Sequence, residues 1–304
     1  MRIVIALGGN ALLHRGERPD ADVQQANIDR VAIAIAALAH EHEVVVTHGN
    51  GPQIGLLAME SAADAALTAP YPLDLLGAQT QGMIGSLLAR TLHDALPGRR
   101  VAALVTHTLV RPNDPAFAHP EKFIGQVYSA EAARALATER GWHVARDTTG
   151  WRRVVPSPAP ERIVETDTIR ELVDLGTLVI CAGGGGVPVV PDGEHGGLRG
   201  VEAVVDKDLT AALLAEDLKA DFLLILTDVP HVYADYGGPG QRPVLEATPA
   251  ELRRGDFPAG SMGPKTQAAA RFVENTGGLA AIGALDAAYE IVRGRAGTLV
   301  RPEP

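Results

Sequence analysis

Short apolar runs rich in β-branched residues alternate along the chain with longer segments in which apolar residues recur every three or four positions. The short runs predict β-strands at residues 3–7, 44–47, 101–106, 178–181, 222–226 and 279–282. The longer segments predict helices at residues 23–39, 73–92, 168–175, 207–218 and 262–275. This alternation predicts an α/β fold with a mainly parallel sheet covered by helices on both faces.

One long segment breaks the alternation. Prolines cluster at both ends of residues 111–160, and both tryptophans, Trp142 and Trp151, lie inside this segment. Because proline interrupts helices and central strands, we expect the chain to leave the main sheet here and to return to it. We interpret the segment as a small subdomain or lid, and a long decorated loop is the alternative.

Composition narrows the class of protein. The chain has 304 residues, 46% of them hydrophobic and 21% charged, as is usual for soluble globular proteins. A formal net charge of −10 disfavours binding to nucleic acids or anionic membranes. No apolar run approaches the roughly 18 residues of a membrane-spanning helix, and no signal peptide is recognisable. The single cysteine, Cys181, allows no intrachain disulfide and fits a reducing cytoplasm.

Three of the expected strands end in glycine-rich turns, in the segments RIVIALGGNALL, EVVVTHGNGPQIG and TLVICAGGGGVPVV. Ligands of open α/β sheets bind beyond the carboxyl ends of the strands, where bare N–H groups and helix N-termini favour anions. The turns therefore predict one anion-binding crevice, with tight-turn chemistry as the alternative. Four consecutive glycines are entropically costly, so we expect substrate or phosphate to come close to the backbone there.

Two segments resemble familiar phosphate-binding motifs, but neither segment matches its motif completely. In GSMGPKT, Pro264 separates Gly263 from Lys265, so no Walker A loop is formed. In GNGPQIG, Gly55 stands one place too late for the dinucleotide fingerprint, and the acidic candidate, Asp74, does not end a strand.

Lysine is scarce in this sequence, with four lysines against 23 arginines. Lys219 has the context of a solvated helix end, whereas Lys122, Lys207 and Lys265 lie in the unusual segments HPEKFIG, VVDKDLT and GSMGPKT. A crowded phosphoryl site can require a compact ammonium group, so we interpret these three lysines as functional. The Asp-Lys-Asp triplet around Lys207 fits a helix start capped by Asp206, and a surface salt-bridge cluster is the alternative.

The segment FLLILTDVPHVY supplies a further candidate site. An apolar strand ends there in Thr227-Asp228, and Tyr233 follows shortly after. This arrangement suits a nucleotide base and ribose, with a simple turn or helix cap as the alternative.

The ordered segments ALGGNAL, VTHGNGPQIG, PEKFIG, AGGGGVPV, VDKDL, LTDVPHVY and GSMGPK resemble the carbamate kinase branch of the amino-acid kinase family. The resemblance extends from residue 3 to about residue 274. It implies a three-layer α/β/α sandwich with a central, mostly parallel sheet of about eight strands and a protruding subdomain at about 111–160. It implies one domain over 1–304, whose N-terminal half (about 1–205) binds carbamate or carbamoyl phosphate and whose C-terminal half (about 206–304) binds the nucleotide.

The same resemblance implies an activity. The expected reaction is reversible phosphoryl transfer between ATP and carbamate, giving ADP and carbamoyl phosphate, in arginine or related nitrogen catabolism. Mg²⁺ would be held mainly by the nucleotide, with no protein ligand named. The protein is expected to be a cytoplasmic homodimer.

The resemblance also assigns roles to positions. Lys122 would reach in from the subdomain, Lys207 and Lys265 would neutralise phosphoryl charge, and Asp208 would orient these lysines. The transferred phosphoryl group would contact Gly8, Gly9 and Asn10, and the carbamoyl end would contact Gly49, Asn50 and Gly51. The crevice between the halves would be lined by Gly183, Gly184, Gly185 and Gly186. The nucleotide would be bordered by Asp228, Tyr233, Met262, Gly263 and Lys265.

One position separates the branches of the family. Many amino-acid kinases have a lysine two residues before the first glycine pair, where this chain has Ala6. Carbamate kinases also lack that lysine, and Lys122 matches the lysine that replaces it. Glu121 and Phe123 depart from the common family text P-T-K-P-I-G. Another phosphotransferase of the family, a non-catalytic nucleotide-binding regulator and, from GNGPQIG alone, a dinucleotide oxidoreductase remain as alternatives.

Overall fold

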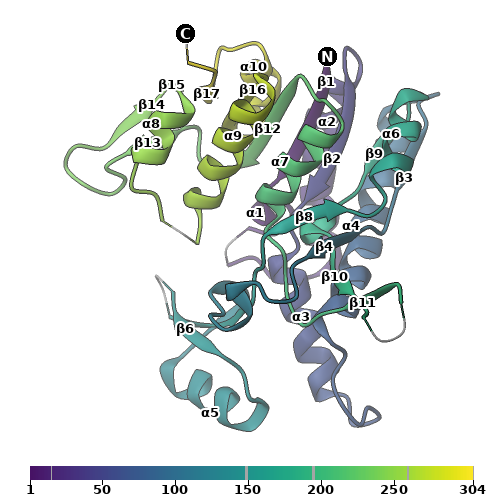
Figure 1. Ribbon diagram of the computed structural model, residues 1–304, viewed down its shortest axis with the longest axis vertical. Helices are drawn as coiled ribbons and strands as arrows, with labels where there is room; N and C mark the ends of the chain where they lie inside the picture. The colour runs from purple at the N-terminus through teal and green to yellow at the C-terminus, as the bar shows by residue number, and fades with distance from the viewer. Residues whose placement is uncertain (15, 148–149, 194–195, 259, 304) are drawn as a thin grey trace.

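An eight-stranded sheet with the order β15-β17-β16-β12-β1-β2-β9-β3 forms the centre of the molecule (Figure 1). The computed structural model describes residues 1–14, 16–147, 150–193, 196–258 and 260–303. The strands are β1 (Arg2–Leu7), β2 (Glu43–His48), β3 (Val101–Ala103), β9 (Leu178–Ile180), β12 (Phe222–Thr227), β15 (Glu246–Ala247), β16 (Leu279–Ala284) and β17 (Thr298–Val300). Neighbouring strands are parallel except β16 and β17. The expected mostly parallel sheet of about eight strands is confirmed.

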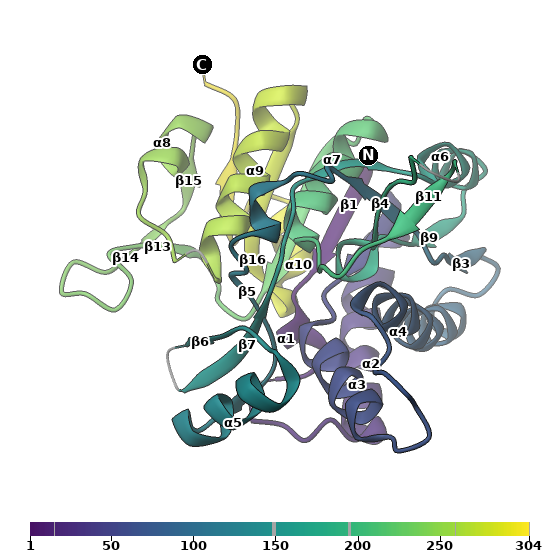
Figure 2. The same cartoon turned by 60° about the horizontal axis from the view of Figure 1, so that its bottom comes forward.

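Helices cover both faces of this sheet. One face carries α6 (Thr166–Asp174), α7 (Lys207–Asp217), α8 (Pro249–Arg254) and α9 (Met262–Thr276). The other face carries α2 (Ala21–Ala39), α4 (Leu73–Ala95) and α10 (Ala288–Val292). Figure 2 shows α7 and α9 on one side of β1 and α2 and α4 on the other. The three-layer α/β/α arrangement is therefore confirmed.

The strand sequences explain the two cores. In β1, Val4 and Ala6 pack into the core that contains α7 and α9, whereas Ile3, Ile5 and Leu7 pack into the core that contains α2 and α4. Successive side chains of a strand point to opposite faces, so a strand buried on both faces requires an unbroken apolar run. The run at the N-terminus has this character throughout.

The strand expected at residues 101–106 is shorter than predicted. β3 ends at Ala103, and the chain continues into β4 (His107–Val110) of a second sheet. Between them, buried Thr106 donates from its backbone N–H to Gln81 Oε1 at 3.1 Å, and its Oγ1 accepts the N–H of Ala182 at 2.9 Å. These polar contacts replace sheet hydrogen bonds. The second sheet has the order β11-β10-β4-β8 and includes β8 (Pro160–Ile163), β10 (Val187–Pro191) and β11 (Leu198–Gly200).

The proline-bounded segment contains a small sheet and helix of its own. The antiparallel strands β5 (Lys122–Tyr128), β7 (Trp151–Val155) and β6 (Val144–Arg146) accompany α5 (Ala130–Arg140), after the short η1 (Pro115–Phe117). In Figure 1, β6 and α5 lie at the bottom of the view, apart from the central sheet. We call residues 122–155 the subdomain. The division of the chain into a substrate half and a nucleotide half stays a prediction.

Two glycines bring the subdomain against the core. A Cβ atom on Gly55, in α3 (Gly51–Ala63), would overlap the backbone of Gly125 in β5. The third glycine of GNGPQIG is therefore required by this contact. The remaining elements are α1 (Gly9–Leu12), the hairpin of β13 (Val232–Ala234) and β14 (Arg242–Val244), η2 (Gly183–Gly185) and η3 (Leu285–Ala287). Within the described ranges, no helix combines the length and apolar character needed to cross a membrane.

Candidate active site

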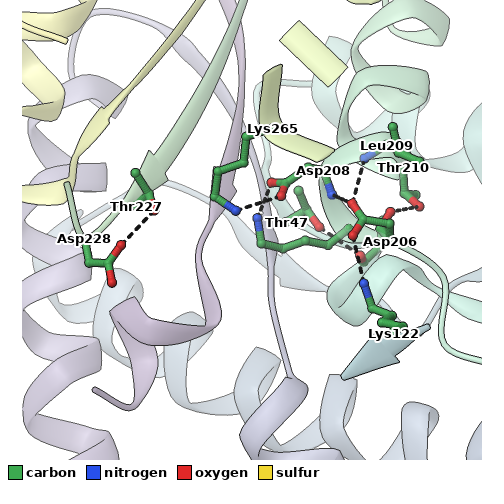
Figure 3. A network of polar contacts seen from close by, with 11 residues as sticks. Thr47, Lys122, Asp206, Asp208, Leu209, Thr210, Thr227, Asp228 and Lys265 are labelled. Atoms are coloured by element: carbon green, nitrogen blue, oxygen red, sulfur yellow. Dashed lines mark hydrogen bonds and ion pairs between the residues drawn. The ribbon is translucent and has the colours of Figure 1, made fainter. Parts of the chain in front are cut away.

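A buried carboxylate, that of Asp208, holds two of the predicted lysines. Lys207 is the first residue of α7 and Lys265 lies in the first turn of α9. The Nζ of Lys207 donates to Asp208 Oδ1, and the Nζ of Lys265 donates to Oδ2 at 3.0 Å. Figure 3 shows the side chains of Lys265 and Asp208 directed toward each other. Two ammonium groups from different helices thus meet at one carboxylate that is only 3% exposed.

The charged groups in this cluster shift one another's pKa values. Burial by itself raises the pKa of Asp208, but the charges and hydrogen bonds of Lys207 and Lys265 outweigh it and lower the pKa well below its usual range. The pKa of Lys265 is raised, because Asp208 more than offsets its burial. The pKa of Lys207 is lowered, because it is more deeply buried and is repelled by Lys265. Asp208 is therefore an anion paired with two ammonium groups, and the orienting role that the resemblance implies for it stays a prediction.

A second carboxylate, that of Asp206, holds the third lysine. Lys122, the first residue of β5, donates from Nζ to Asp206 Oδ2 at 2.8 Å. Asp206 Oδ1 accepts the N–H groups of Asp208 and Leu209, so Asp206 caps α7 as predicted. Its contact with Lys122 was not expected from the sequence. The Asp-Lys-Asp triplet was the available signal, but a spacing along the chain cannot show which lysine comes from a distant strand.

The glycine turns after β1 and β2 lie against each other. A Cβ on Gly49 would lie 2.7 Å from the N atom of Gly9. The N–H of Gly8 donates to the carbonyl of Leu226, and the N–H of Gly49 donates to that of Leu7, both at 2.9 Å. These two amides are engaged inside the protein. In the first turn of α1 the N–H of Ala11 donates to the carbonyl of Gly8. Helix geometry supplies no internal acceptor for the N–H groups of Gly9, Asn10 and Gly51, so these can serve an anion.

The four glycines from Gly183 to Gly186 are buried, and they pack against the protein itself. Cβ atoms at the first two positions would overlap the side chains of His48 and Asn50. A Cβ on Gly185 would lie 2.5 Å from the carbonyl oxygen of Val205, and one on Gly186 would overlap Thr108. The last three also have positive φ angles, which glycine adopts without strain. We expected substrate or phosphate to lie close to the backbone of these glycines. The groups that lie there are other parts of the protein, so protein packing accounts for the glycines.

Two polar side chains at the end of β2, those of His48 and Asn50, have partners within the protein. Asn50 donates from Nδ2 to Thr80 Oγ1 at 2.8 Å, which ties the turn after β2 to α4. His48 is fully buried with its Nδ1 3.0 Å from the carbonyl oxygen of Gly49, and burial lowers its pKa to about 4. His48 is therefore neutral at physiological pH. The side chain of Asn10 lies outside the described residues, although its backbone belongs to α1.

The residues expected around a nucleotide either follow β12 or begin α9. Asp228 follows β12, accepts a hydrogen bond from Thr227 Oγ1 at 3.1 Å, and helps to raise the pKa of Lys265. Gly263, next to Met262 at the start of α9, donates its N–H to the carbonyl of Pro258 at 2.9 Å. Pro258 also lines a cavity whose walls include Tyr233, Tyr236, Arg242 and Phe257. The start of α9 thus lies between the lysine cluster and a cavity that contains Tyr233.

The carboxylates near the lysines are poor candidates for a protein-built metal cage. Asp206 and Asp208 both accept hydrogen bonds from lysine, and among the residues described no three His, Cys, Asp or Glu side chains converge as metal ligands. This donor set fits an ion whose ligands are mainly phosphate oxygens and water.

Comparison with known proteins agrees with the geometry. Residues 1–282 match the model of the amino acid kinase family. The chain is 50% identical to a carbamate kinase of Rhizobium meliloti over 99% of its own length and 93% of that protein's, and 49% identical to one of Haemophilus influenzae over 99% and 96%. It superposes on the solved carbamate kinase of Giardia lamblia with a TM-score of 0.93 and 38% identity, covering 99% and 98% of the two chains. The chain therefore belongs to the amino acid kinase family, and the three proteins named above, each of which it matches over more than nine-tenths of its length, are carbamate kinases.

Proposed function

We propose that this protein is a carbamate kinase, an ATP-dependent enzyme that transfers a phosphoryl group reversibly between ATP and carbamate. The observation that carries the proposal is the set of three lysines, Lys122, Lys207 and Lys265, paired with two aspartates at the start of α7, the buried Asp208 and the partly buried Asp206. Full-length similarity to proteins named carbamate kinase supports the same substrate class.

The mechanism needs charge stabilisation more than acid–base chemistry. In the direction of ATP synthesis, a β-phosphate oxygen of ADP attacks the phosphorus of carbamoyl phosphate, the bond from phosphorus to the carbamate oxygen breaks, and carbamate leaves as an anion. The attacking oxygen is already an anion, so no general base is required. We assign neutralisation of the phosphoryl oxygens to Lys207 and Lys265, and contact with the carbamoyl end to Lys122. Donors in the first turns of α1 and α3, around Gly9, Asn10 and Gly51, would hold the phosphoryl and carbamoyl oxygens.

We assign nucleotide binding to the other side of the lysine cluster. Asp228, Tyr233, Met262 and Gly263 would border ADP or ATP. Support comes from the cavity lined by Tyr233 and Pro258, because the carbonyl of Pro258 accepts the N–H of Gly263 at the start of α9. A magnesium ion would be bound mainly by the nucleotide phosphates, and it would neutralise their charge during transfer. The buried turn from Gly183 to Gly186 would support the crevice from below, through its contacts with His48 and Asn50.

The proposal also covers the oligomeric state of the protein and its cellular compartment. We expect a cytoplasmic homodimer that acts in arginine or related nitrogen catabolism. The dimer is supported by apolar side chains exposed along α4 and the adjacent β11, namely Leu75, Met83 and Leu198. The cytoplasm is supported by Cys181, a buried thiol without a disulfide.

Specific residues argue against each of the three alternative functions. Other branches of the family would place a lysine at the position of Ala6, which is buried here in the core beneath α7. A regulator without catalysis would not require three lysines in one cluster. A dinucleotide oxidoreductase loses its single argument, because Gly55 is explained by its contact with Gly125.

The test is a coupled assay of ATP formed from ADP, Mg²⁺ and fresh carbamoyl phosphate, with an enzyme-free control for spontaneous breakdown of the substrate. Rapid ATP formation would support the proposal. A folded protein that binds ADP but forms no ATP would refute the substrate assignment, and other phosphoryl donors and acceptors would then be screened.

A further inference from the structure

The carboxylate of Asp206 is shared between two distant parts of the chain. Its Oδ1 accepts the N–H of Asp208 at 2.9 Å and that of Leu209 at 3.3 Å, which caps α7. Its Oδ2 accepts the Nζ of Lys122 at 2.8 Å, from the first residue of β5. In Figure 3 the side chain of Lys122 approaches Asp206 from the side opposite to Leu209. One side chain therefore joins the subdomain to the helix that carries Lys207 and Asp208.

The charges require such a partner. Lys207 and Lys265 already share Asp208, so a third ammonium group brought to the same crevice is repelled unless a further anion accompanies it. Asp206 supplies that anion. Burial by itself raises the pKa of Asp206, but the charge and hydrogen bond of Lys122, together with the charge of Lys207, keep that pKa below its usual range. The side chains of Lys122 and Asp206 are 25% and 17% exposed, so water screens this pair less than a surface pair. Three ammonium groups against two carboxylates leave one positive charge for an anionic substrate.

We propose that Asp206 is a positioning residue for the reaction: its carboxylate holds the Lys122 ammonium in the crevice, in fixed relation to Lys207 and Asp208. The consequence for catalysis rests on the proposed function, whereas the placement of Lys122 by Asp206 does not. The subdomain is anchored independently by the contact of Gly55 with Gly125, so loss of the ion pair releases the lysine without detaching β5.

Asparagine separates the two roles of Asp206. Asn caps helices about as well as Asp, because its amide oxygen accepts the same N–H groups. A neutral amide lacks the charge that holds Lys122 among other ammonium groups. Because the cap is retained, Asp206→Asn should still unfold in one cooperative transition, with a melting temperature lowered only by the loss of the ion pair. Asp206→Ser, which also retains a good cap, is the second variant if the Asn variant is poorly folded.

The kinetic test compares Asp206→Asn, Lys122→Ala and the double variant in the ATP-forming assay. We expect Asp206→Asn to lower kcat/KM for carbamoyl phosphate by roughly 10- to 100-fold through misplacement of Lys122. The KM for ADP should change less than about twofold if nucleotide contacts are intact. The double variant should be no worse than Lys122→Ala, because Asp206 acts through that lysine. Multiplied losses in the double variant, or an unchanged kcat/KM in Asp206→Asn, would overturn the proposal.

A chemical test works without any turnover. The chain has four lysines, and the exposed Lys219 serves as an internal reference. Brief treatment with a lysine-acetylating reagent, followed by mass spectrometry, compares Lys122 with Lys219 in the wild type and in Asp206→Asn. We expect acetylation of Lys122 relative to Lys219 to increase severalfold in the variant, and an equal ratio in both proteins would refute the placement. Inactive wild-type enzyme would count against the proposed function, and acetylation alone would then decide the role of Asp206.

Discussion

At the residue scale, the site depends on where ammonium groups find carboxylates. Asp208 lies between Lys207 and Lys265, with its Oδ2 3.0 Å from the Nζ of Lys265. Removal of Lys265 leaves Asp208 paired with Lys207, so the buried carboxylate keeps a partner. Loss of one lysine should therefore affect the reaction far more than the fold.

Lys265→Ala tests this separation. We expect kcat to fall by roughly 100- to 1,000-fold, as after removal of one donor that stabilises a developing anion, with little change in melting temperature. Lys219→Ala is the matched control, because Lys219 is exposed and no role is assigned to it. Steady-state kinetics and thermal unfolding of both variants make the comparison. Near-normal turnover by Lys265→Ala would remove this lysine from the mechanism.

His48 predicts a pH dependence of stability. Its pKa is about 4 in the folded protein, against about 6.5 for an unperturbed histidine. Between these values the unfolded chain binds a proton that the folded protein does not, so this contribution is complete above pH 6.5 and declines as the pH falls toward 4. From pH 7 to pH 5, urea unfolding should show a loss of about 2 kcal/mol that is absent in His48→Asn. Equal losses in the two proteins would show that another group is responsible.

At the scale of elements, the turn after β9 is determined by packing. Gly184, Gly185 and Gly186 have positive φ angles, and each lies against a group that leaves no room for a Cβ atom. These contacts hold the ends of β2, β4 and β9 together beneath the lysine cluster. The turn thereby fixes the positions of these strand ends.

Gly185→Ala should be strongly destabilising. The new Cβ would lie 2.5 Å from the backbone carbonyl of Val205, at a residue with φ of 93°. Gly98→Ala is the control, since its φ of 83° imposes similar strain but no atom lies within 4 Å. We expect the control to cost about 1–2 kcal/mol and Gly185→Ala clearly more, by denaturant unfolding. Equal costs would mean that the contact with Val205 is unimportant.

At the scale of the whole molecule, we expect activity to require that the subdomain stays against α3. Lys122 lies on β5, and β5 contacts α3 where Gly125 meets Gly55. No rotation of a side chain can relieve an overlap of Cβ with backbone, so a substituent here must move the two elements apart.

Gly55→Ala should therefore impair the use of carbamoyl phosphate. We expect a higher KM for carbamoyl phosphate and a lower kcat, with the KM for ADP nearly unchanged, because the nucleotide residues lie on other elements. Gly77→Ala in α4 is the control: it has no atom within 4 Å of the added Cβ, and alanine favours a helix over glycine by about 1 kcal/mol. Two-substrate kinetics would contradict the prediction if both KM values rose together in Gly55→Ala.

The sequence alone predicted six of the eight strands of the central sheet and its long helices α2, α4, α7 and α9, but not the short strands β15 and β17. Strands such as β1 and β12 are buried on both faces and must be continuously apolar, and helices such as α2 and α4 show their apolar stripe directly. The scarcity of lysine is enough to single out Lys122, Lys207 and Lys265 as candidates for the site. The helices α3 and α5 were not predicted, because GPQIG looks like a turn and α5 buries little apolar surface.

Only the tertiary structure decided how these parts meet. In the structure, β3 ends at Ala103, where Thr106 contacts Gln81. The glycine turn after β9 lies against His48 and Asn50. The structure also pairs Lys122 with Asp206, 84 positions away in the chain. Hydrophobic periodicity is a local property, and it can be recognised within a short window of the sequence. The partner of a charged side chain, or of a glycine backbone, comes from a chain segment that only folding brings close. Spacing along the chain therefore could not identify that partner.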